Sequence, residues 1–249
     1  MKFRPLITKG IVRRALTFLI CFFGASGAAN AVGPTEYEWL AWPDFCKAGF
    51  VGSSWSPAVS SFKGKMSDAQ ATNLRSIQET TVGIPGVHHF CMGMTYTNRA
   101  KTMGRNQNVR ETLGNAINEL EYSFSRMTPA APRYSLVTAY YGTALYRLGK
   151  RRESMDMWNK GIEAKPASRE SYLAMAEALL AEKKAKEALE VLLRYENAKD
   201  SDAPDAEAFL AHTYIELGMY EKAREHADKA YQFGYPLPGL RNKLARIGK

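Results

Sequence analysis

The chain has 249 residues, of which 34 are lysine or arginine and 25 are aspartate or glutamate, for a net charge of +9 at pH 7. Five basic residues and no acidic ones fall in the first 31 positions, so residues 32–249 carry only +4, with 29 basic against 25 acidic side chains. A balance this small, without a basic stripe interleaved with aromatic residues, argues against a nucleic-acid-binding protein.

The first 31 residues have the pattern of a secretory signal peptide. A basic head precedes the apolar run Ala15–Ala25, which is too short to cross a bilayer as a stable anchor, and Ala29–Ala31 offers the small residues that signal peptidase needs. Ile20 stands directly before Cys21 and argues against a lipoprotein cleavage site. We therefore expect a periplasmic or secreted protein; an uncleaved membrane anchor is the alternative.

Residues 32–86 differ from the rest of the chain and are rich in Gly, Ser, Pro and Trp. One helix is predicted inside this irregular segment, because Ser67–Gln70 has the form of a capping box. The aromatic residues before it lack the regular spacing of an amphipathic helix, and we expect them to cover the exposed end of a helical array. An aromatic patch that binds a membrane surface or a ligand is the alternative. These aromatic residues are Trp39, Trp42, Phe45, Phe50 and Trp55.

From Arg133 onward the sequence repeats itself with a period of 34 to 35 residues. A large apolar residue followed by a small one recurs as Tyr141-Gly142, Met175-Ala176 and Leu210-Ala211, and another large side chain comes three positions later in each unit. Apolar residues at spacings of three and four predict helices with one apolar stripe, and the small residues let two antiparallel helices pack closely.

These units resemble the tetratricopeptide repeat (TPR), whose pattern of tryptophan, leucine-glycine, tyrosine, alanine, phenylalanine and proline they meet approximately between Arg133 and Tyr235. They depart from it at Thr138 and Glu207, where the family often has tryptophan, and at Lys183, which replaces the turn glycine. The resemblance implies an all-α fold, a short helical solenoid. It says little about function, because the scaffold serves many partners.

The stretch Val87–Ala100 fits the same template, since Met92-Gly93 and Tyr96 fall at the repeat spacings. Its second helix is delayed by a longer connection at Lys101–Asn108, and the apolar stripe resumes at Leu113. We expect a degenerate fourth pair before three clear ones. The predicted organisation is a signal peptide at 1–31, an aromatic-rich irregular segment at 32–86, a TPR-like array at 87–235 and a basic C-terminal tail at 236–249.

Two cysteines remain once Cys21 leaves with the signal peptide. Cys46 and Cys91 then form the one possible pair in a compartment that permits disulfides, and we expect them to be bridged. The alternatives are a zinc or copper site that uses both thiolates with His88 and His89, or two unrelated buried thiols.

The metal alternative has little support from spacing. Adjacent histidines on a helix point apart, so His88 and His89 do not converge on one ion, and no Cys-x2-Cys or His-x3-His accompanies them. His212 and His226 lack a paired ligand at helical spacing, and we expect both on helix surfaces. No cofactor is predicted.

Motifs of known enzyme classes are missing: the sequence has no Gly-x-Ser-x-Gly elbow, no phosphate-binding glycine-rich loop and no His-Glu-x2-His. We therefore predict a non-enzymatic adaptor that binds a protein segment within an envelope assembly. A thiol- or metal-dependent module centred on Cys46, His88 and Cys91 is the alternative. Membrane contact is possible but is not expected after signal cleavage.

The resemblance to TPR proteins also implies where the partner binds, because the first helices of such arrays line a concave groove. The groove lacks the lysine and asparagine set that clamps a terminal carboxylate in some family members. Tyr146 and Arg147 are the strongest local candidates for partner contact. The predicted groove residues are Met94, Asn98, Thr143, Tyr146, Arg147, Glu177, Leu180, His212 and Glu216. Leu136, Ala139, Glu170, Leu173, Asp205, Thr97, Ala208 and Ile215 complete the lining.

Processing gives the first testable prediction. The exported protein should begin at Val32, because Ala29–Ala31 forms the cleavage motif. Mass spectrometry of the N-terminal peptide from exported protein measures this directly. A peptide that begins at Met1, or an acylated Cys21, would contradict it.

Overall fold

The computed structural model of the chain describes residues 33–52, 82–104 and 108–247, together with positions 67, 69, 72, 73 and 77. All of the described residues belong to one unit, formed by residues 32–249. The predicted signal peptide lies outside the described residues. So does most of the helix predicted after Ser67, where helical backbone is described at Ala69, Thr72 and Asn73.

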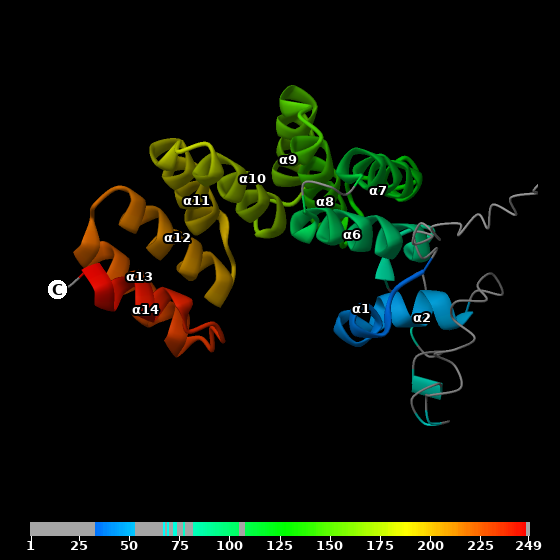
Figure 1. Cartoon of the computed structure of the whole chain (residues 1–249), viewed down its shortest axis with the longest axis horizontal. Coiled ribbons are helices and arrows are strands. Elements are labelled where there is room, and N and C mark those ends of the chain that lie inside the picture. Colours follow the sequence, from blue (N-terminus) through cyan, green and yellow to red (C-terminus); the bar gives the residue numbers. More distant parts are fainter. Residues whose placement is uncertain are drawn as a thin grey trace, which may run out of the picture. The chain divides into compact units, whose positions relative to one another are not determined.

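All regular structure in the described part of the chain is helical, and its main body is a row of helix pairs (Figure 1). Each pair packs its first helix against its second, and the first helices α6, α8, α10 and α12 also contact one another in sequence order. This confirms the predicted all-α helical solenoid. The pairs are α6 (Val87–Thr102) with α7 (Val109–Phe124), α8 (Tyr134–Arg147) with α9 (Arg151–Ala164), α10 (Glu170–Ala181) with α11 (Ala185–Ala198), and α12 (Pro204–Glu216) with α13 (Tyr220–Gln232).

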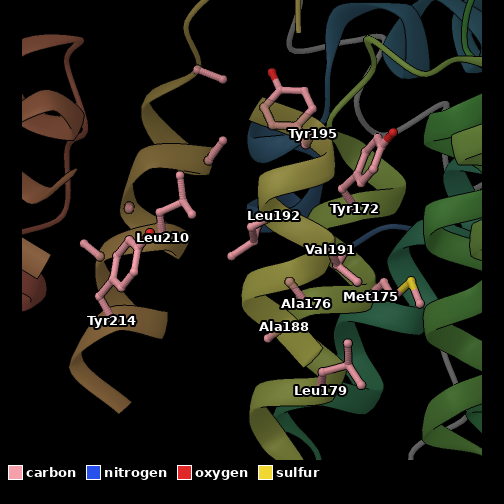
Figure 2. Close-up of a cluster of buried hydrophobic side chains, with 14 of the residues drawn as sticks. Tyr172, Met175, Ala176, Leu179, Ala188, Val191, Leu192, Tyr195, Leu210 and Tyr214 are labelled. Atoms are coloured by element: carbon pink, nitrogen blue, oxygen red, sulfur yellow. The ribbon is translucent and has the colours of Figure 1, made fainter. Parts of the chain in front are cut away.

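Apolar side chains from neighbouring pairs share one core. In Figure 2, side chains of α10 and α11 face each other, and Leu210 and Tyr214 come from α12 in the following pair. Because one pair cannot bury its apolar stripe alone, this sharing is what stabilises the row. Within the described segments, no helix combines the length and the apolar character that crossing a membrane requires.

The small residues of the repeat lie where helices come closest. A side chain at Gly142 on α8 would overlap the indole of Trp158 on α9, whose Nε1 donates a hydrogen bond of 3.2 Å to the Ala139 carbonyl. A side chain at Gly161 would likewise overlap the hydroxyls of Thr138 and Ser171. The predicted close approach of paired helices at small residues is therefore confirmed.

The turns within the pairs share one geometry. Gly149, Lys183 and Gly218 follow α8, α10 and α12 with φ values of 93°, 63° and 71°, which is the left-handed region. The residue after each donates its N–H to a carbonyl five positions back, as in a Schellman motif. Lys183 thus occupies the turn position in a conformation that costs a side-chain-bearing residue about 1 kcal/mol relative to glycine.

The N-terminal segment is not irregular as predicted, because two short helices, α1 (Glu36–Ala41) and α2 (Asp44–Gly52), occupy its first part. Pro43 separates them, so their buried positions follow no common period. Trp39, Trp42 and Phe50 are buried with residues of α6, which agrees with the expected covering of the array's end. Trp55 lies outside the described residues.

Most of the predicted basic C-terminal tail forms a helix, α14 (Gly239–Ile247), which the sequence analysis did not predict. Leu240 is 1% exposed, and Leu244 and Ile247 continue its apolar face onto the core of the last pair. The Tyr231 hydroxyl donates to the Leu237 carbonyl and accepts from the Arg241 N–H, which fixes the start of the helix. Leu240, Leu244 and Ile247 lie four and three positions apart in the sequence, which is a spacing that indicates a helix.

One buried carboxylate joins three helices of the C-terminal part. The Glu207 side chain on α12 is 3% exposed, with Lys199 Nζ at 3.3 Å and His226 Nδ1 at 2.7 Å. Burial opposes the charge on Lys199, yet hydrogen bonds to Glu196 and Asp202 raise its pKa above the ordinary value. The expected surface role of His226 was wrong, because its ring packs between Tyr214 and this carboxylate.

The Gly142 contact generates the second prediction. Gly142→Ala should lower the free energy of unfolding by about 1–3 kcal/mol, because the added methyl group displaces Trp158. Gly114→Ala on α7 is the matched control, since nothing lies within 4 Å of the added carbon there. That change should stabilise by about 0.5–1 kcal/mol through helix propensity. Urea unfolding of both variants is the measurement, and an unchanged Gly142→Ala midpoint would contradict the contact.

Candidate protein-binding groove

A hollow of about 310 Å³ lies over the first helices of successive pairs. Its floor is apolar and aromatic, with Leu136 and Tyr140 from α8, Leu173 from α10 and Phe209 from α12. All four side chains are partly exposed, so they present apolar surface to solvent. Such a concave apolar surface with a polar edge is the usual form of a binding site.

Two ion pairs border this hollow. Lys101 Nζ on α6 lies 3.5 Å from Glu177 Oε2 on α10, and Arg169 Nε lies 2.9 Å from Asp205 Oδ2. Burial opposes the charge on Arg169, but the hydrogen bond to Asp205 raises its pKa above the ordinary value. Both pairs join different helices across the hollow, so its charged groups are positioned by the stacking of the pairs.

A second hollow of about 290 Å³ continues toward the C-terminus and shares Glu177 and Phe209 with the first. His212 lies in it, and burial together with the nearby Lys243 lowers the pKa of this histidine. The imidazole is therefore neutral at pH 7. The two hollows form a continuous surface, which we call the groove. The second hollow is lined by Glu177, Leu180, Lys183, Phe209, His212, Glu216 and Lys243.

Most of the predicted lining residues lie in the groove. They share one property: each lies on a first helix, at spacings of three, four or seven along the chain. The groove contains Leu136, Ala139, Thr143, Glu170, Leu173, Glu177, Leu180, Asp205, His212 and Glu216. Asn98 is exposed and is not among the residues that line the two hollows, so its contact with a partner stays a prediction.

Some predicted lining residues are buried instead. Met94 is 7% exposed and belongs to the hydrophobic cluster beneath α6, and Thr97 donates to the Gly93 carbonyl. Ala208 and Ile215 are buried in the core of the C-terminal pairs. These placements correct the predicted lining, because small differences in helix rotation turn a side chain from the groove into the core.

Tyr146 and Arg147 join successive pairs and are not among the residues that line the two hollows. The Tyr146 hydroxyl donates to the Ala178 carbonyl on α10 at 3.1 Å, and its ring packs against Trp158 and under the Arg151 guanidinium. Arg147 donates to the Ala100 carbonyl on α6. Both side chains therefore make contacts between successive pairs, with Tyr146 partly buried and Arg147 exposed, and their contact with a partner stays a prediction.

Several groove residues are absent from the lining predicted from the sequence. Tyr140 lies four positions after Leu136, and Phe209 lies four positions after Asp205. The helical spacing that predicted Leu136 and Asp205 in the lining therefore also indicates Tyr140 and Phe209. Lys101 was assigned to a connection, although α6 continues to Thr102. Lys243 was assigned to a tail. Arg169 and Lys183 stand next to helix ends, where sequence boundaries are least certain.

A disulfide joins Cys46 on α2 to Cys91 on α6, with Cα atoms 5.7 Å apart. The predicted bridge is present, and neither sulfur is available as a thiolate ligand. His89 Nδ1 lies 2.6 Å from the Glu119 carboxylate, and its ring stacks on Tyr122. No group of three potential metal ligands occurs among the described residues. The alternative module centred on Cys46, His88 and Cys91 is therefore not supported.

Comparison with known proteins leaves the family open. No protein-family model matches the chain, and no curated protein does. A solved structure described as MamA MSR-1 C2 is 16% identical over 73% of this chain and 88% of its own, with a TM-score of 0.38. A second one, of a MamA point mutant, is 15% identical over 79% of this chain and 97% of its own, with a TM-score of 0.37. Neither bears on what this chain binds.

The disulfide supplies the third prediction. Replacing both Cys46 and Cys91 by alanine should lower the free energy of unfolding by about 4 kcal/mol, the chain-entropy value for a loop of this length. Denaturant unfolding with and without reductant measures it, and the reduced wild-type protein should approach the variant. Labelling of two free thiols in unreduced, denatured protein would contradict the bridge.

Proposed function

We propose that this protein is a non-catalytic interaction scaffold that holds a segment of another protein in the groove. One observation carries the proposal: the first helices of successive pairs present Leu136, Tyr140, Leu173 and Phe209 side by side as partly exposed apolar surface. An apolar centre surrounded by a polar rim is the usual arrangement of a protein interface.

The proposed location is the periplasm or the extracellular space, with a partner in the cell envelope. The predicted signal peptide motivates this, and the Cys46–Cys91 disulfide is compatible with it, because such bonds persist in oxidising compartments. The predicted signal peptide and the disulfide also motivate the adaptor role that we propose in the envelope.

A pair of matched leucine variants gives the fourth prediction. Leu173→Asp places a charge on the groove floor, and Leu193→Asp places the same charge on the exposed face of α11. Proteins captured by crosslinking in intact cells should fall at least about tenfold with Leu173→Asp, since floor contacts carry the binding. Leu193→Asp should leave capture unchanged.

Two measurements separate binding from folding in this experiment. The melting temperature of each variant shows whether Leu173→Asp still folds. A photo-crosslinking side chain in place of Glu177, with one in place of Glu190 on α11 as control, tests contact without altering the floor. Equal capture from both positions, or full capture by a folded Leu173→Asp, would reject the groove as the binding site.

A further inference from the structure

The charges along the groove balance and are largely paired with one another. The two hollows are lined by four cationic side chains and four carboxylates. Three of each sign are joined across helices: Lys101 with Glu177, Arg169 with Asp205, and Lys243 with Glu216. Lys183 and Glu170 complete the set with one charge of each sign.

This balance has a direct consequence for selection of a partner. Charged partners are steered and retained by a site whose summed charge has the opposite sign. Here the neighbouring charges cancel, so neither an acidic nor a basic segment gains net attraction. The pKa of His212 is lowered by burial and by Lys243, so the histidine adds no positive charge at pH 7.

The apolar floor of the groove supplies the attraction for a peptide that the paired charges at its border do not. Leu136, Tyr140, Leu173 and Phe209 are held in place by the cores beneath them and remain partly open to solvent. Covering them removes apolar surface from water, which favours binding in proportion to the area covered. We infer that the groove selects a short, uncharged peptide segment with apolar side chains, an inference that rests on the proposed function.

The spacing of the helices sets the length of that segment. Packed helices lie about 8–10 Å apart, so a chain that crosses α8, α10 and α12 spans about 18 Å. An extended chain rises about 3.3 Å per residue, so roughly six residues cover the floor. Side chains that point to one side alternate along such a segment, and three of them reach the floor.

Three series of eight-residue peptides test this inference, the fifth prediction. All share apolar residues at alternate positions, and the positions between are serine, aspartate or lysine. The serine series should bind the full-length mature protein, with a Kd that changes less than about twofold between 50 and 500 mM NaCl. Neither charged series should bind more tightly than the serine series. Leu173→Asp should abolish binding, and Leu193→Asp should not.

A charge variant tests the pairing itself. Glu177→Gln leaves Lys101 without its partner and should raise the affinity of the aspartate series at least about threefold. Glu190→Gln on α11 makes the same change in net charge outside the groove and should have no effect. Tenfold tighter binding of either charged series to the wild type, or no gain with Glu177→Gln, would overturn the inference. Absence of peptide binding would also overturn it, whereas the capture experiment in cells judges the proposed function separately.

Discussion

The close approach of paired helices at small residues is the constraint on which the rest of this structure depends. Where Gly142 meets the Trp158 indole and Gly161 meets Thr138 and Ser171, an added methyl group has no room. The contacts of Gly142 with Trp158 and of Gly161 with Thr138 set the distance within a pair. The contact of Gly161 with Ser171 on α10 and the shared core set the distance to the next pair. The positions of the first helices follow from both, and with them the groove.

The two ends of the array are covered in different ways. At the first end, α1 and α2 bury Trp39 and Trp42 against α6, and the Cys46–Cys91 bridge holds them there. At the other end, α14 lays Leu240 on the last pair and also contributes Lys243 to the groove. Covering the terminal apolar faces keeps such an array soluble, and at the second end the cover also completes the binding surface.

The groove combines a fixed apolar floor with charges that neutralise one another. Lys101 and Glu177 come from helices of different pairs, as do Arg169 and Asp205, so each ion pair also marks the stacking of one pair on the next. These pairs are half exposed, and their contribution to stability is small. These ion pairs affect which partner binds. Because their charges cancel, apolar contact is left as the main source of affinity for a partner.

The sequence by itself determined the helical solenoid, the small residues at the helix crossings, the disulfide and most of the groove lining, because these depend on local period and on cysteine parity. Only the tertiary structure decided whether each side chain packs in the core or lines the groove. Met94 is buried in the core and Tyr146 packs, partly buried, between two helix pairs, whereas Tyr140 and Phe209 reach the groove, since a modest rotation of a helix redirects a side chain. Partners such as Lys101 and Glu177, which lie 76 positions apart, meet through the packing of helices that no sequence spacing records.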